Sequence, residues 1–157
     1  MYHYNLGTLF SEVVAIHAHS PALRYPQGAV SYSDLHGLVE KLAQLLLDKG
    51  CQRGDVIAIA HTKQPLSYAL MLAGLKLGIP YVNIDVASPV ARNARIISVS
   101  NPRLIFCDDR QYLDGLQELA DQSGCPLAML EEACLQDVTQ LQSAEQVRLM
   151  TLVDGAC

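Results

Sequence analysis

Hydrophobic residues between positions 55 and 85 form two short runs with a longer apolar segment between them. The first run ends at Ala60 and is rich in β-branched residues, which is typical of a buried strand. Residues 65–78 then carry apolar side chains at helical spacing, with Pro65 suited to a first helical turn and Gly78 to a left-handed end. Residues 81–84 form the second run. This order predicts a βαβ unit with parallel strands.

The segment before this unit predicts a helix and then a hairpin. Residues 6–19 have helical spacing, and the candidate N-caps are Thr8 and Ser11. The side chains expected to face inward are Leu9, Phe10, Val13 and Ile16. Residues 22–25 and 29–32 flank a Pro-Gln-Gly turn whose glycine is able to adopt positive φ, and this pattern predicts a β-hairpin.

Helical and strand patterns alternate along the remaining chain. Ser31 or Ser33 is expected to cap a long amphipathic helix that ends near Gly50, and Thr62 is expected to cap the helix that follows the first strand. Ser88 and Pro89 predict the start of another helix. Further strands are expected at residues 104–107, 126–130 and 147–153, with a helix at about 110–123 and an ambiguous stretch at 131–146.

Together these patterns predict the α/β class. We expect a mostly parallel sheet with helices on both faces, plus an N-terminal helix and β-hairpin. A chain of 157 residues is the size of one domain and is able to bury a core. Half of its residues are hydrophobic and 17% are charged, which excludes a disordered chain.

Neither a membrane span nor a signal peptide is predicted. No apolar run reaches about 18 residues, and the first five residues lack a basic start followed by an apolar stretch. We therefore expect a cytoplasmic protein.

Charge is distributed unevenly along the chain. Residues 1–107 carry 9 basic and 6 acidic side chains (net +3), and residues 108–157 carry 2 basic and 10 acidic ones (net −8). A nucleic-acid-binding protein needs a basic face with exposed aromatic residues, and this pattern offers none. The acidic half is interpreted as solvated helix faces, with a docking surface for a basic partner as the alternative.

The pattern of cysteine and histidine residues argues against a metal site. The five cysteines are an odd number without a Cys-x-x-Cys pair, so we expect buried or incidental thiols. The cysteines are Cys51, Cys107, Cys125, Cys134 and Cys157. His17 and His19 are two residues apart, and on a helix such side chains point to opposite sides.

Candidate chemistry is expected beyond the carboxyl ends of the strands, where parallel sheets bind ligands. Those ends hold His61-Thr62-Lys63, Asp85 and Asp108-Asp109. Each has a structural alternative: a capped turn, a turn-forming carboxylate and a helix start. No Gly-x-Gly, P-loop or Gly-x-Ser-x-Gly motif is present, so no catalytic, cofactor-binding or metal-binding residue and no cofactor are predicted.

Several segments, taken in order, resemble the N-terminal part of the adenylate-forming (AMP-binding) superfamily. Residues 30–35 (Val-Ser-Tyr-Ser-Asp-Leu) are similar to its Thr/Ser-Tyr-x-Glu/Asp-Leu motif, and residues 54–59 to its Gly-Asp-x-Val-Ala strand. Residues 75–85 resemble its Leu-Lys-Ala-Gly-x-Ala-Tyr-Val-Pro-Leu-Asp motif, with Asn83 replacing the proline. The remaining matches are Ser88-Pro89 with Arg92, Ile96-Ile97 and Leu104-Ile105-Phe106. This superfamily contains acyl-CoA synthetases and the adenylation domains of nonribosomal peptide synthetases.

The resemblance also implies what this chain lacks. The family's next element is a strand followed by a Ser/Thr/Gly-rich loop ending in Pro-Lys-Gly, which embraces the ATP phosphates. Residues 149–153 are a candidate for that strand, but Asp154-Gly155 follows it, and an aspartate repels a phosphate. We therefore expect residues 1–157 to be a single, truncated adenylation-like domain, with none of the family's catalytic residues carried over.

Three functions follow as hypotheses. The first is a truncated adenylate-forming ligase-like protein that does not catalyse adenylation alone. The second is a non-catalytic module whose exposed apolar faces are covered by a protein partner or by a homo-oligomer, with neither nucleic acid nor membrane as a partner. The third is an independent small-molecule binder that uses the strand ends near His61, Asp85 and Asp108.

Overall fold

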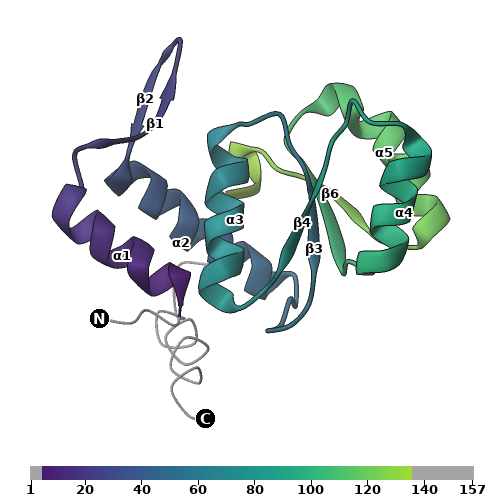
Figure 1. The fold of residues 1–157 in the computed structure, drawn as a ribbon, viewed down its shortest axis with the longest axis horizontal. Coiled ribbons are helices and arrows are strands. Elements are labelled where there is room, and N and C mark those ends of the chain that lie inside the picture. The colour runs from purple at the N-terminus through teal and green to yellow at the C-terminus, as the bar shows by residue number, and fades with distance from the viewer. Residues whose placement is uncertain (1–4, 136–157) are drawn as a thin grey trace.

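The computed structural model describes residues 5–135 as a three-layer α/β/α unit with a helical and hairpin extension (Figure 1). Its central sheet has four parallel strands in the order β4-β3-β5-β6. The strands are β3 (Ile57–Ala60), β4 (Tyr81–Ile84), β5 (Leu104–Cys107) and β6 (Leu127–Met129). The predicted parallel sheet with helices on both faces is confirmed.

Helices cover the two faces of the sheet (Figure 1). One face packs against α2 (Tyr32–Asp48) and α3 (Pro65–Leu77), and the other against α4 (Val90–Ser100) and α5 (Leu113–Ser123). A short 3₁₀ turn, η1 (Arg110–Tyr112), precedes α5, and a second one, η2 (Glu132–Leu135), follows β6.

Alternation along the strands divides the core into two clusters. Successive side chains of a strand point to opposite faces of the sheet, so one strand contributes side chains to both core clusters. Ile57 and Ile59 of β3 pack toward α2 and α3, whereas Ala58 and Ala60 pack toward α4 and α5. All four are fully buried, which explains why β3 has a continuous rather than alternating hydrophobic pattern.

The N-terminal extension consists of α1 (Leu6–His17), β1 (Pro21–Tyr25) and β2 (Gly28–Ser31). The two strands form the predicted antiparallel hairpin, which projects away from the main sheet (Figure 1). Helix α1 packs against α3 and α2. The predicted inward stripe of α1 was partly wrong, because Ile16 is 76% exposed and Leu9 is 36% exposed.

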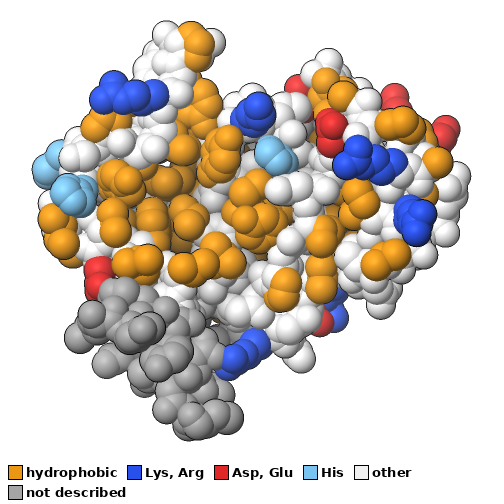
Figure 2. Space-filling view, viewed as in Figure 1, with side chains coloured by type: hydrophobic (Ala, Val, Ile, Leu, Met, Phe, Trp, Pro, Cys, Tyr) orange, Lys and Arg blue, Asp and Glu red, His pale blue; other side chains and the backbone are white. Residues whose placement is uncertain are grey.

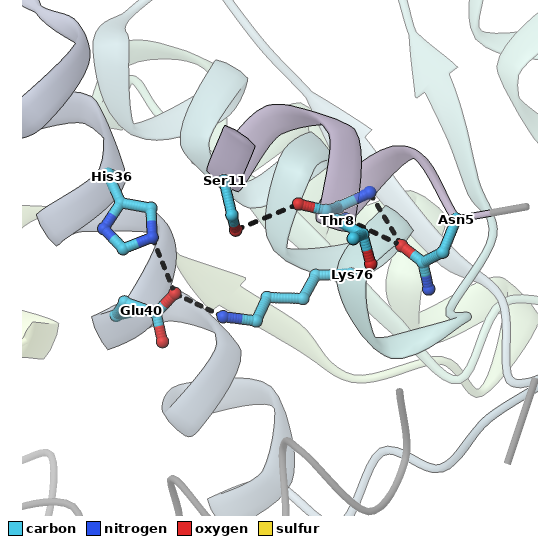
Figure 3. Close-up of polar contacts among 7 residues, drawn as sticks. Asn5, Thr8, Ser11, His36, Glu40 and Lys76 are labelled. Atoms are coloured by element: carbon cyan, nitrogen blue, oxygen red, sulfur yellow. Dashed lines mark hydrogen bonds and ion pairs between the residues drawn. The ribbon is translucent and has the colours of Figure 1, made fainter. Parts of the chain in front are cut away.

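The contact between α1 and α3 is very close at one residue. A Cβ on Gly7 would lie 2.6 Å from the Cα of Lys76, so only glycine fits there. Figure 3 shows the polar contacts around this junction. The Glu40 carboxylate of α2 lies between Lys76 Nζ, with which it forms an ion pair, and His36 Nε2 at 3.3 Å. One carboxylate therefore links α2 to the helix on which α1 rests.

Several helices begin at an N-cap residue other than the predicted one. Asn5 caps α1, with its Oδ1 accepting from Gly7 N at 2.7 Å, so the prediction of Thr8 or Ser11 was wrong (Figure 3). Ser31 caps α2 as expected. Thr62 does not cap α3, whose N-cap is Gln64, and the N-cap of α4 is Pro89 rather than Ser88. Local sequence does not decide between neighbouring polar side chains when tertiary partners compete for them.

Helix ends at glycine agree with prediction. Gly78 after α3 and Gly124 after α5 both have a backbone φ of +68°, which residues other than glycine rarely adopt. The expected strand at 147–153 and most of the ambiguous stretch at 131–146 lie outside the described residues. Within residues 5–135, no helix is long and apolar enough to cross a membrane.

Candidate functional site

The carboxyl ends of β3 and β5 lie side by side at the point where the strand order reverses. From β3 the chain crosses through α3 to β4 on one side, and from β4 it crosses through α4 to β5 on the other. Such a switch point is where open α/β sheets usually bind ligands. The residues that follow these two strands are His61-Thr62-Lys63 and Asp108-Asp109, as the sequence indicated.

At this switch point the Asp108 carboxylate accepts hydrogen bonds from the segment that leads into α3. Its Oδ1 and Oδ2 accept from Thr62 N at 2.8 and 2.9 Å, and Oδ1 also accepts from Thr62 Oγ1 at 3.1 Å. Ser67 Oγ, fully buried in the first turns of α3, donates to Oδ2 at 2.7 Å. Three donors near the start of α3 (Thr62 N, Thr62 Oγ1 and Ser67 Oγ) are therefore engaged by the protein itself.

Asp85, at the end of β4, has a local role as well. Its carboxylate accepts from Ala87 N at 3.0 Å and Ser88 Oγ at 3.0 Å. These two hydrogen bonds hold the pKa of Asp85 below its ordinary value, with smaller contributions from the charges of Arg92 and His61. The structure therefore assigns Asp85 to the turn that leads into α4, which is the structural alternative considered for it.

Asn93 is a residue that the sequence reasoning missed. It is 5% exposed, and its Nδ2 donates to Asp85 O at 3.0 Å. Its Oδ1 is buried and has no hydrogen-bond partner among the described residues. Asn93 lines a small cavity of about 170 Å³ between α4 and α5, together with Ser88 and Gln111. An asparagine among helical apolar residues was the only sequence signal for this position.

The loop between β3 and α3 holds a strained residue. Lys63 has φ of +67°, which is uncommon for a residue other than glycine. Its N–H donates to His61 Nδ1 at 3.3 Å, and its carbonyl accepts from Tyr25 Oη of the hairpin at 3.1 Å. The His61 ring lies near Tyr68, with the ring centroids 6.4 Å apart. Lys63 is thus tied to the hairpin, and the preceding residue, Thr62, is bonded to the Asp108 carboxylate.

Three cysteines, Cys51, Cys107 and Cys125, are buried free thiols. Burial raises the pKa of Cys51, Cys107 and Cys125, so each stays protonated at neutral pH. Residues 5–135 contain no group of three His, Cys, Asp or Glu side chains arranged to hold a metal ion.

A comparison with known protein families matches residues 10–154 to the family described as "AMP-binding enzyme". This match spans most of the chain. The chain belongs to the AMP-binding enzyme family. The resemblance inferred from the ordered motifs is thereby confirmed.

Curated relatives include synthetases and ligases. The hybrid PKS-NRPS synthetase lepA of Aspergillus flavus is 34% identical over 119 residues, which cover 74% of this chain and 3% of the relative. An L-proline--[L-prolyl-carrier protein] ligase of Streptomyces coelicolor is 34% identical over 94 residues, covering 60% of this chain and 18% of that one. The chain therefore spans only a small part of these relatives.

Solved structures share the fold. NpsA-ThdA, an artificially fused adenylation-PCP di-domain from Klebsiella oxytoca, superposes with a TM-score of 0.75 at 24% identity, covering 88% of this chain and 25% of that one. A benzoate CoA ligase from Burkholderia xenovorans gives 0.78 at 15% identity, covering 87% and 29%. VinN in complex with 3-methylaspartate gives 0.76 at 18% identity, covering 99% and 40%. The described fold is thus that of the beginning of an adenylation domain's N-terminal subdomain.

Proposed function

We propose that residues 1–157 act as one adenylate-forming ligase-like unit that does not activate an acid by itself. Membership of the AMP-binding family and the likeness to adenylation domains and CoA ligases support the ligase-like assignment. The inability to act alone is our inference from the site. We assign no catalytic, cofactor-binding or metal-binding residue to this chain.

The Asp108 carboxylate is the observation on which this inference rests. It accepts hydrogen bonds from Thr62 and Ser67 at the switch point of the sheet. A nucleotide phosphate at that position would meet a negative charge instead of free donors, and like charges at hydrogen-bonding distance repel strongly. We infer that the described unit supplies a scaffold and that the groups that grip ATP lie outside residues 5–135.

ATP–pyrophosphate exchange with a panel of amino acids and carboxylic acids tests this proposal. We expect the purified 157-residue chain to give no exchange above the enzyme-free blank. The prolyl-carrier-protein ligase of Streptomyces coelicolor, with proline as substrate, serves as the positive control. Circular dichroism on the same sample verifies that the chain is folded. Exchange well above the blank with any acid would overturn the proposal.

A second candidate is a non-catalytic interaction module, and the surface of α1 favours it. Figure 2 shows hydrophobic side chains gathered over the side of the molecule formed by α1, α2 and α3. On α1, Leu6 is 56% exposed and Ile16 is 76% exposed. Exposed apolar area of this kind commonly marks a contact surface. The two edge strands of the described sheet, β4 and β6, are further candidate contact surfaces, because unpaired strand edges are commonly covered.

Light scattering as a function of protein concentration tests the module hypothesis. We expect the chain to self-associate and the double variant Leu6→Glu/Ile16→Glu to be monomeric, since a charge on an apolar contact surface opposes burial. Lys41→Glu, on the exposed side of α2, is the control for a change of charge alone. A monomeric parent chain at all concentrations would contradict self-association.

A further inference from the structure

A groove separates the hairpin from the β3–α3 loop, and we call it the hairpin groove. Its walls include Arg24, Tyr25 and Gln27 on one side and Lys63, Gln64 and Tyr68 on the other. Its volume is about 590 Å³. The groove adjoins the switch point of the sheet at Thr62, which lines the groove and donates to the Asp108 carboxylate at 2.8 Å.

The exposed charges that line the groove are positive, and the Asp108 carboxylate lies behind the lining residue Thr62, to which it is hydrogen-bonded. Arg24 and Lys63 are both exposed, and none of the described residues that line the groove is acidic. Two basic residues elsewhere in the described part of the chain pair with carboxylates: Lys76 with Glu40, and Arg110, whose Nη2 lies 2.7 Å from Glu131 Oε1. Figure 2 shows Lys and Arg side chains on the hairpin and above α3, with hydrophobic side chains between them.

The geometry of the groove is set before any ligand arrives. Tyr25 Oη donates to the Lys63 carbonyl at 3.1 Å, which ties the hairpin to the β3–α3 loop. Burial, with the nearby Tyr68, raises the pKa of Tyr25, so its hydroxyl remains a donor at neutral pH. The positive φ of Lys63 is maintained by this contact and by the His61 ring. Backbone strain that is held in place beside a cavity is typical of functional surfaces.

One wall of the groove is also the open edge of a strand. Within the described residues β1 pairs with β2 on one side only, and β1 contributes Arg24 and Tyr25 to the groove. An extended peptide is able to add to such an edge through its backbone, while its side chains select the partner. The Tyr25 and Tyr68 rings offer apolar contact between the two cations.

We propose that the hairpin groove binds an extended acidic peptide segment of a partner protein. Carboxylates of the segment pair with Arg24 and Lys63, and an apolar residue between them packs on the tyrosines. This goes beyond the proposed function, because it requires neither ATP nor an acid substrate. Its failure would leave the result of the exchange assay unaffected.

Fluorescence anisotropy with labelled peptides tests the proposal. The probe is an eight-residue peptide of alternating glutamate and valine, and the matched control replaces each glutamate by glutamine. We expect the acidic peptide to bind, the neutral peptide to bind at least about 10-fold more weakly, and affinity to fall as salt rises. Inorganic phosphate and ATP are added as competitors to identify a site for small anions.

Variants of the two cations connect binding to this groove. Arg24→Gln and Lys63→Asn remove one charge each, and asparagine tolerates positive φ. We expect each to weaken binding by about 3-fold, as for exposed ion pairs, and the double variant by about 10-fold. Lys41→Gln, on α2, is the control and should bind like the parent chain. Unchanged melting temperatures verify that these exposed substitutions leave the fold intact.

Three results would overturn the proposal. Equal binding of the acidic and neutral peptides would remove the role of charge. Parental affinity in the Arg24→Gln/Lys63→Asn double variant would place the peptide elsewhere. Displacement of the peptide by millimolar phosphate at constant ionic strength would identify a small-anion site instead of a peptide-binding groove.

Discussion

The carboxylate of Asp108 accepts a hydrogen bond from Thr62 N at 2.8 Å, across 46 residues of sequence. This contact joins the end of β5 to the loop that begins α3. It also lies at the switch point of the sheet, where open α/β sheets commonly bind ligands. The same bond therefore accounts for local stability and for our inference that this unit does not hold a nucleotide alone.

Asp108→Ala should destabilise the protein by about 2 kcal/mol, since it leaves the Thr62 N–H and the buried Ser67 hydroxyl without their acceptor. Urea unfolding followed by circular dichroism measures this. Asp109→Ala is the matched control, because the Asp109 carboxylate accepts only local hydrogen bonds, from Gln111 N and Gln111 Nε2, and we expect a smaller loss of about 1 kcal/mol. Equal losses in the two variants would contradict the bridging role of Asp108.

Gly7→Ala should destabilise the protein by about 1–3 kcal/mol, because the added Cβ would lie 2.6 Å from the Lys76 backbone. Gly37→Ala is the control: Gly37 is in α2 with nothing within 4 Å of an added Cβ, so we expect a gain of about 0.5–1 kcal/mol. Thermal unfolding measures both changes. A neutral Gly7→Ala variant would show that α1 moves away from α3 without cost.

Asp85→Asn should lower stability in a pH-dependent manner. The folded-state pKa of Asp85 is lowered, chiefly by Ala87 N and then by Ser88 Oγ. Its contribution is therefore fully present above the unfolded-state pKa of about 4, and it is lost as pH falls through the lower folded value. Unfolding midpoints of both proteins between pH 7 and pH 2 should converge at the acidic end. A difference that stays constant over this range would contradict the assignment.

The three buried cysteines should be unreactive in the folded state. In a Cys134→Ser/Cys157→Ser variant, we expect Ellman's reagent to modify no thiol at pH 7.5 and three thiols in guanidinium chloride. Burial raises the pKa of Cys51, Cys107 and Cys125, and the thiolate is the reactive form. Rapid modification under native conditions would show local opening near one of the three.

The sequence was sufficient for the secondary structure because those signals are local. The apolar run of β5 (Leu104–Cys107), the leucine spacing of α2 and the left-handed Gly78 are each contained within a few residues. The ordered family motifs came from the sequence too, and the family match confirms them. The cap of α3 was not predicted correctly, because Thr62 is engaged by Asp108, which is remote in sequence.

Sequence alone determined that this chain alternates strands and helices around a parallel core and that it resembles an AMP-binding enzyme. Only the tertiary structure decided that Asp108 lies against Thr62, that Gly7 meets Lys76, and that Arg24 and Lys63 share one groove. The physical reason is that patterns of hydrophobicity specify which residues are buried along each element. Which distant polar groups meet depends on strand order and helix packing, and these are set by the whole chain at once.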